Sequence, residues 1–217
     1  MLRTENRPLA QNRMSMLEAT IAALIMGLIG VGMIAHYLVG MCAILSLVSL
    51  CLYGFVYTPL KKVTPLAVHI GAIPGALPAV IGYVAANGSL DGMAWILFFI
   101  QVLWQFPHFY SIAWILDDDY KRAGIKLMPL FAMKDRRGAI QIMLFTSLLI
   151  PMSVLAFILG FTGLIATIVL VALSGYFFYQ SLQLLKDLTN ASAKKLMFGS
   201  FLYLPVAFII ILIDKIF

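Results

Sequence analysis

Charged residues are scarce in this chain of 217 residues. Only 11% of them are Asp, Glu, Lys or Arg, whereas 63% are hydrophobic, and the mean hydropathy is +1.01. A soluble domain is about half apolar and about a quarter charged. The composition therefore excludes a soluble globular protein and indicates an integral membrane protein.

Cysteine is scarce as well, and the first residues are polar. Cys42 and Cys51 both lie inside apolar segments, so we expect packed thiols and no disulfide framework. The polar start, MLRTENRPLAQNR, has no apolar core and does not read as a signal peptide. The net charge of +6 does not indicate nucleic-acid binding, because the basic residues lie in short loops between apolar segments.

Long apolar runs are what the chain has in abundance. A helix needs about 20 apolar residues to cross the hydrocarbon core, and seven segments reach that length, approximately 16–36, 38–57, 66–86, 93–116, 139–160, 162–182 and 195–213. Backbone polar groups cannot be left open in lipid, so all seven should be helices. The sequence predicts an all-α integral membrane protein whose residues 1–217 form a single transmembrane domain.

The basic residues are distributed unevenly between the two sides of the predicted bundle. All 15 lysines and arginines except Lys215 lie in the N-terminal tail or in the loops 58–65, 117–138 and 183–195. Loops rich in Lys and Arg stay on the cytoplasmic side of a membrane. We therefore expect these loops to be cytoplasmic and the C-terminus to lie outside, in a bacterial cytoplasmic (inner) membrane.

The fourth span and the loop after it, QVLWQFPHFYSIAWILDDDYKRAGIKLMPL, are the most informative part of the chain. Gln101, Gln105 and His108 are spaced i, i+4, i+7 and share one helical face. Asp119 would extend this face if the helix continued regularly. Because ionisable residues within a span usually have a function, the stripe predicts the wall of a cavity open to the cytoplasm. The alternative is that these side chains only bond to neighbouring helices.

Three consecutive aspartates, Asp117, Asp118 and Asp119, follow this span. Consecutive side chains cannot all face one site, so we expect one or two to bind a divalent cation and the rest to be solvated. The alternative is a charge-paired loop, because Lys121 and Arg122 come next.

Basic residues on the same side are candidates for binding an anion. Arg3 and Arg7 are spaced i, i+4 and would share a face of a helix, and the arginine fork matches phosphate oxygens. Lys61 and Lys62 lie on the same side. The alternative is that these residues only flank cytoplasmic helix ends. Carboxylates for Mg²⁺ together with arginines for phosphate would suit a diphosphate group.

At this point the sequence resembles a known family. The run WQFPHFYSIAWILDDDYKRAGIKLMPL is similar to a conserved region of protohaem IX farnesyltransferases (haem O synthases), of the intramembrane aromatic prenyltransferase (UbiA-type) superfamily. That region reads W-x-x-P-H-F and then D-Y-x-x-A-G-I-x-x-L-P. The stretches IGAIPGALPAVIGYVAANG and RTENRPL resemble two other motifs of this family, in family order.

The resemblance implies a reaction and its participants. Farnesyl diphosphate would donate its chain to a vinyl group of haem B, with water completing the new group, to give haem O and diphosphate for terminal oxidases. Asp119, with Asp118 or Asp117, would hold Mg²⁺. The expected partners besides the substrates are the lipid bilayer and oxidase or haem A synthase assembly proteins, and no nucleic acid.

The resemblance also implies roles for the other candidates. His108 would act beside Asp119 as a catalytic residue that contacts haem, through its iron or through an acceptor group. Diphosphate or haem propionates would be bound by Arg3, Arg7, Lys61 and Lys62. The cavity would be lined by Gln101, Gln105 and Tyr120.

One feature departs from the family pattern. Family members have nine helices and an aspartate-rich motif just before R-T-x-x-R-P-L, whereas this chain begins two residues before Arg3. We therefore expect seven spans that form the C-terminal part of a nine-helix bundle, and we expect the 217 residues alone to be inactive. The alternatives are a prenyltransferase for a quinone or other aromatic acceptor and an inactive membrane remnant.

Overall fold

The computed structural model describes residues 5–61, 63–122, 124 and 134–216, and within these ranges the regular structure is entirely helical. Seven helical segments of this part are long and apolar enough to cross a membrane. The prediction of an all-α membrane protein is therefore confirmed. The elements are α1 (Met16–Tyr37), α2 (Gly40–Cys51), α3 (Thr58–Leu60), α4 (Ala67–Asn87), α5 (Gly92–Ile115), α6 (Asp117–Arg122), α7 (Arg136–Ile158), α8 (Leu164–Asp187) and α9 (Asn190–Ile216).

The second span is built from three pieces. A π-helical segment, η2 (Leu52–Tyr57), joins α2 to α3, so that the span runs over Gly40–Leu60. Such wide turns within α-helices are rare and occur often at functional sites.

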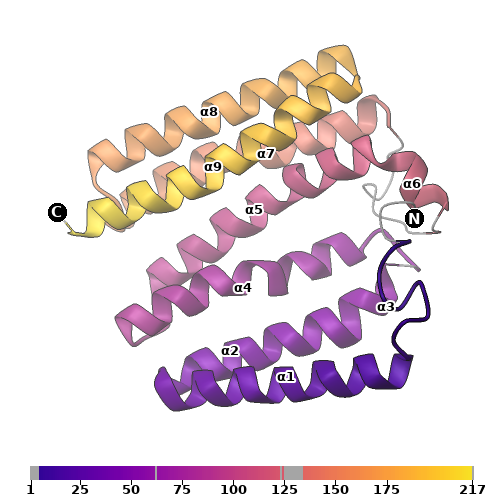
Figure 1. The fold of residues 1–217 in the computed structure, drawn as a ribbon. Helices are drawn as coiled ribbons and strands as arrows, with labels where there is room; N and C mark the ends of the chain where they lie inside the picture. Colours follow the sequence, from indigo (N-terminus) through magenta and orange to yellow (C-terminus); the bar gives the residue numbers. More distant parts are fainter. Residues whose placement is uncertain (1–4, 62, 123, 125–133, 217) are drawn as a thin grey trace.

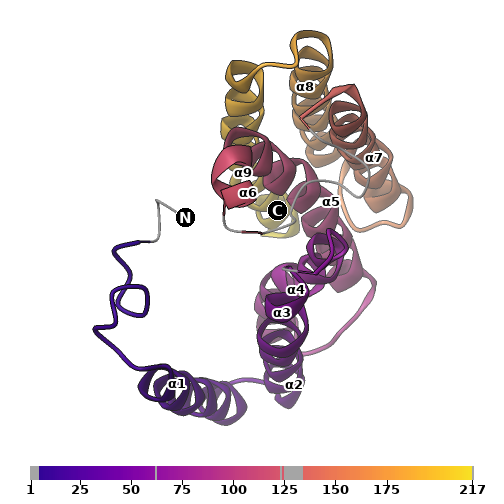
Figure 2. The same cartoon turned by 90° about the vertical axis from the view of Figure 1, so that its right-hand side faces the viewer.

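Helix α5 is the centre of the arrangement. It packs against α4 on one side and against α7 and α9 on the other, while α8 bridges α7 and α9. Helix α1 packs mainly on α2, none of its span is buried, and it stands apart from α5 and α7–α9 in the end-on view of Figure 2. Figure 1 shows α6 at the opposite end of the bundle from the C-terminus.

Local signals in the sequence explain where the helices begin. Ser15 and Glu18 form a capping box at the start of α1. Asp91 caps α5 by accepting hydrogen bonds from the backbone N–H groups of Met93 and Ala94. Burial raises the pKa of Asp91, but these bonds and those from Tyr83 and Asn87 outweigh it and leave the pKa below its ordinary value.

Polar contacts tie α7, α8 and α9 together within the apolar bundle. Thr146 Oγ1 lies 2.8 Å from Ser181 Oγ, and Ser174 Oγ lies 3.4 Å from Ser153 Oγ and 3.2 Å from the hydroxyl of Tyr203. Lipid supplies no hydrophobic drive between helices, so such bonds, each about 0.6 kcal/mol, help to hold a bundle together. They join α7 to α8 and α8 to α9.

Several helices extend beyond the predicted spans. The predicted loop 117–138 contains α6 and the first turn of α7, because Asp135 caps α7 through the N–H groups of Arg137 and Gly138. In the predicted loop 183–195, α8 continues to Asp187 and α9 already begins at Asn190. The hydropathy pattern marks only the apolar part of each helix, whereas capping decides where the helix begins.

Candidate active site

The aspartates lie on a new helix and do not continue α5. Leu116 ends α5 with φ −101° and ψ 19°, and α6 starts at Asp117. The condition under which Asp119 would extend the face of His108 is therefore not met, because α5 does not continue regularly past Leu116. The three carboxylates occupy the first turn of α6, where the positive end of the helix dipole favours them.

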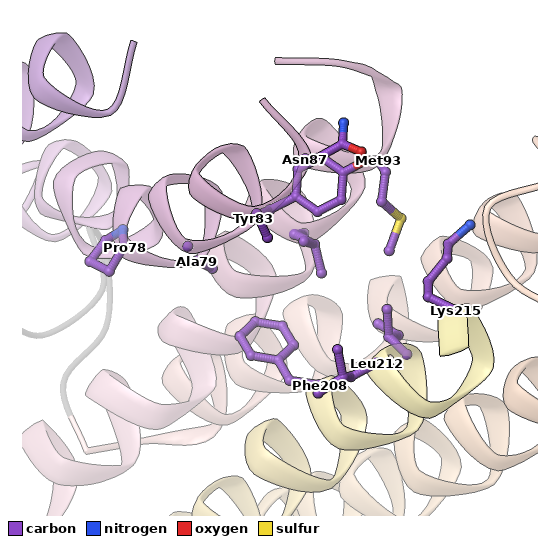
Figure 3. A pocket seen from close by; sticks show the side chains of 12 residues that line it. Pro78, Ala79, Tyr83, Asn87, Met93, Phe208, Leu212 and Lys215 are labelled. Carbon is purple, nitrogen blue, oxygen red and sulfur yellow. The ribbon is translucent and has the colours of Figure 1, made fainter. Parts of the chain in front are cut away.

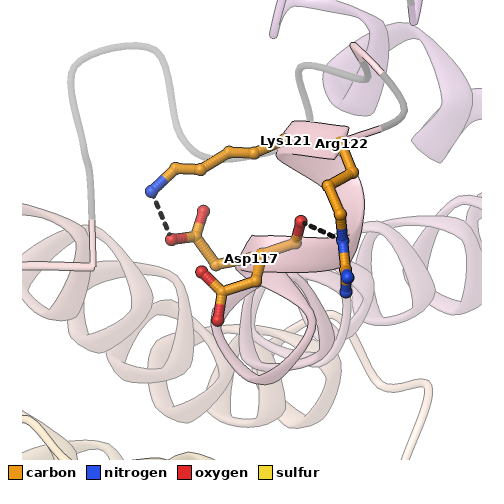
Figure 4. A network of polar contacts seen from close by, with 4 residues as sticks. Asp117, Lys121 and Arg122 are labelled. Atoms are coloured by element: carbon orange, nitrogen blue, oxygen red, sulfur yellow. Dashed lines mark hydrogen bonds and ion pairs between the residues drawn. The ribbon is translucent and has the colours of Figure 1, made fainter.

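The three aspartates differ in their surroundings. Asp117 and Asp119 are buried, whereas Asp118 is exposed. Lys121 Nζ lies 2.7 Å from Asp117 Oδ2, as Figure 4 shows, and this contact raises the pKa of Lys121. Arg122 lies 3.7 Å from Asp119 and also donates to the backbone oxygen of Asp118. The buried pair thus meets two cations at one end of the bundle.

A small cavity of about 90 Å³ borders α6. Tyr120 of α6 and Gln105 of α5 both line it, together with residues of η2, α4 and α5, namely Tyr53, Tyr57, Val68, Gly71, Gly75, Phe109 and Ile112. Gln105 Nε2 donates to the carbonyl of Ala72 at 3.1 Å, which holds the side chain across the α4–α5 contact. Two of the predicted cavity residues therefore share a cavity.

Two glycines of α4 leave space for the side chains that line this cavity. A β-carbon at position 71 would lie 2.6 Å from Cδ2 of Tyr57, and one at position 75 would meet the side-chain oxygen of Gln105. Lys61 contacts the same tyrosine. Its Nζ lies 5.7 Å from the centre of the Tyr57 ring and forms a cation–π contact. Lys61 therefore stands close to the cavity wall.

Arg7, one of the two arginines predicted to share a helical face, is not on a helix. Residues 5–14 form turns and bends, and Arg7 is exposed there. Pro8 is the physical reason, since a residue before proline is pushed out of the helical region. The helix expected around the arginine pair is therefore absent from residues 5–14. Arg3 and Lys62 lie outside the described residues.

Whereas Gln105 contacts α4, His108 contacts α9. It is buried, its ring stacks on that of Trp104 at a centroid distance of 4.7 Å, and its Nδ1 lies 2.7 Å from Ser200 Oγ. His108 is not among the residues that line the cavity with Gln105. The side-chain oxygen of Gln101 is buried and has no hydrogen-bond partner among the described residues.

A larger apolar groove runs between α4 and α9 at the end of the bundle opposite to α6. Its volume is about 630 Å³, and Figure 3 shows Tyr83 of α4 and Phe208 and Leu212 of α9 on its two sides. Leu97 of α5 also lines it. His108 follows Leu97 by about three helical turns, so it shares the groove face of α5. The groove and His108 therefore lie along one face of the central helix.

The donor set at α6 suits one kind of metal. No group of three or more His, Cys, Asp or Glu residues that could hold a metal ion occurs in the part of the chain that the structure describes. Mg²⁺, however, is commonly held by one or two carboxylates together with substrate phosphates. The buried carboxylates of Asp117 and Asp119 fit such a shared site.

Comparison with known proteins identifies the family. The model of the UbiA prenyltransferase family matches residues 1–204. The chain belongs to the UbiA prenyltransferase family.

Relatives within this family are similar over almost the whole chain. A protein of Cytophaga hutchinsonii named protoheme IX farnesyltransferase is 43% identical over 217 residues, which are 100% of this chain and 76% of that protein. Proteins of the same name from Flavobacterium johnsoniae and Koribacter versatilis are 40% and 36% identical, over 98% and 99% of this chain and 72% of each protein.

The UbiA-type fold is also found in a solved structure. A chain described as digeranylgeranylglyceryl phosphate synthase superposes with a TM-score of 0.77 at 17% identity, covering 98% of this chain and 75% of that one. The likeness supports the helical arrangement and carries nothing about the substrate.

The structure also adds residues that the sequence did not single out. Tyr57 forms a cavity wall through η2, and Ser200 bonds to His108 from another helix. No local signal marks Ser200, since a lone serine in an apolar helix has many uses. Trp104 belongs to the family motif, but the motif does not predict that Trp104 contacts Ser200 on α9.

We predict that Gly71→Ala pushes Tyr57 out of its position and lowers the stability of the protein by about 1–3 kcal/mol, because the added carbon overpacks the wall. The matched control is Gly82→Ala on the same helix, where a β-carbon meets nothing within 4 Å. Thermal unfolding in detergent measures both. Equal unfolding temperatures for the two variants would contradict the prediction.

Proposed function

We propose that this protein transfers a farnesyl group from farnesyl diphosphate to a vinyl group of haem B, giving haem O and diphosphate. The observation that carries the proposal is the 43% identity, over all 217 residues, to a protein named protoheme IX farnesyltransferase. Membership of the UbiA prenyltransferase family supports the reaction class.

The α6 end is suited to the diphosphate. Lys121 and Arg122 stand beside the buried carboxylates, and Lys61 lies at the adjoining cavity. Cations held in place before the reaction stabilise the charge that grows on a departing diphosphate. Asp117 and Asp119 would hold Mg²⁺, which when bound would neutralise part of that charge.

The groove face of α5 is suited to the apolar partners. The groove between α4 and α9 has an apolar lining that includes Leu97, Phe208 and Leu212. Such a lining can bind an isoprenoid chain and excludes water, which limits side reactions of a reactive allylic centre. His108 lies along the same face of α5, where it would contact the haem.

We also propose how the protein lies in the membrane. The α6 end carries Lys61, Lys121 and Arg122, and the rule for basic loops makes such an end cytoplasmic. The C-terminus lies at the opposite end of the bundle (Figure 1). In a bacterium this corresponds to the inner membrane, with the diphosphate site open to the cytoplasm.

The direct test is product analysis. Membranes with the 217-residue chain are incubated with farnesyl diphosphate and haem B, and the products are identified by mass. A parallel sample carries a chimera with the part of the Cytophaga hutchinsonii relative that lies outside the alignment. We expect haem O from the chimera and none from the 217 residues alone. A chimera that prenylates 4-hydroxybenzoate but not haem B would contradict the proposal.

Substitution of each aspartate tests whether they bind a metal or only form a solvated loop. In the active form, we predict that Asp119→Ala lowers haem O formation by about 100-fold or more. Asp117→Ala should also be impaired, because its carboxylate is buried at the same end. The matched control is Asp118→Ala, which removes an exposed carboxylate and should retain most activity. Equal losses for Asp118→Ala and Asp119→Ala would argue against these assignments.

Removal of divalent cations tests the metal proposal separately. We predict that EDTA abolishes haem O formation and that added Mg²⁺ restores it, because the carboxylates alone would repel the diphosphate. Haem binding, measured by absorption, should not change under the same treatment. Full activity in EDTA would mean that the cationic side chains suffice.

A further inference from the structure

The surroundings of His108 define the state of its ring. The ring lies between Trp104, stacked at an interplanar angle of 11°, and Phe201 of α9, at a centroid distance of 5.1 Å. Nδ1 lies 2.7 Å from Ser200 Oγ, and both residues are buried. The ring is therefore held on three sides.

The hydrogen bonds of Ser200 decide which atom donates in this contact. A serine hydroxyl has one hydrogen, and Ser200 Oγ donates it to the carbonyl of Met197 at 2.5 Å. Both contacts of Ser200 Oγ can be hydrogen bonds only if it accepts from His108, which requires the hydrogen on Nδ1. The neutral imidazole then carries its lone pair on Nε2.

The position of Ser200 is itself fixed. Nε1 of Trp104 donates to the backbone oxygen of Ser200 at 2.8 Å. Trp104 therefore stacks on the histidine and also anchors the residue that receives its hydrogen bond. This closed set of contacts joins α5 to α9, two helices that pack directly against each other.

The second ring nitrogen remains available for a ligand. Nε2 of His108 has no hydrogen-bond partner among the described residues. It is also absent from the described polar atoms that are fully buried and unpaired, so it stays accessible. A histidine that donates its Nδ1 hydrogen to an oxygen and presents Nε2 is the usual form of a metal ligand. The haem acceptor brings an iron of its own.

We propose that Ser200 is a positioning residue that holds His108 in the Nδ1–H form, so that Nε2 ligates the iron of the haem substrate. The inference rests on the proposed function, because it takes haem as the acceptor. It places the porphyrin on the Nε2 side of His108, and not in the cavity with Gln105 and Tyr120.

The test follows ferrous haem B bound to the purified chain by absorption and by the resonance Raman band of the iron–histidine bond. We expect this band in the wild type and its loss in His108→Ala, with recovery on adding imidazole. Ser200→Ala should lower the frequency of the band and weaken haem binding by about 10-fold or more, as the loss of a ligand's hydrogen-bond partner does. Ser200→Thr, which keeps the hydroxyl, should restore both.

The matched control is Ser181→Ala. Ser181 is also fully buried and also donates to a carbonyl in its own helix, that of Phe178, but its other partner is Thr146. This variant should bind haem like the wild type. A band unchanged in Ser200→Ala, or equal weakening in Ser181→Ala, would overturn the inference.

A measurement on the wild type does not depend on how the variants fold. Nitrogen-15 chemical shifts of labelled His108 distinguish the two tautomers, and a hydrogen on Nε2 would overturn the inference. Failure of the proposed function has a different signature. In that case the chimera yields no haem O, whatever the tautomer of His108.

Discussion

The hydrocarbon interior of a membrane offers polar groups no water, and the rest of this structure follows from that constraint. It forces the backbone into helices, and it favours partners on neighbouring helices for polar side chains inside the bundle. Gln105 finds the backbone of α4, and His108 finds Ser200 on α9. The hydrogen bonds of these side chains therefore show which helices pack against each other.

Helix α5 carries two different environments on its two sides. Toward α4, small residues let the backbones approach, and Gln105 and Tyr57 fit against Gly75 and Gly71. Toward α9, aromatic rings and a serine surround His108. The division separates the small cavity near the aspartates from the face along which an apolar substrate can lie.

The end of α5 shows why the aspartates act differently from one another. The helical phase is lost at Leu116, and a new short helix turns Asp117 and Asp119 inward and Asp118 outward. A divalent cation shared with a diphosphate needs only one or two carboxylates from the protein. In the proposed reaction the buried pair would supply them, and the cations beside it would face the phosphates.

The sequence by itself determined the class of the fold, the seven spans and the stretch of chain that holds the candidate residues, because hydropathy and helix length are local properties. It could not place the helix ends, since capping by residues such as Asp135 depends on single side chains outside the apolar runs. It did not reveal the break in the helix at Leu116, on which the phase of Asp119 depends, or the non-helical conformation of the segment that holds Arg7. Only the tertiary structure decided that Ser200 meets His108 and that Tyr57 meets Gly71, because these residues lie on different helices and come together only through packing.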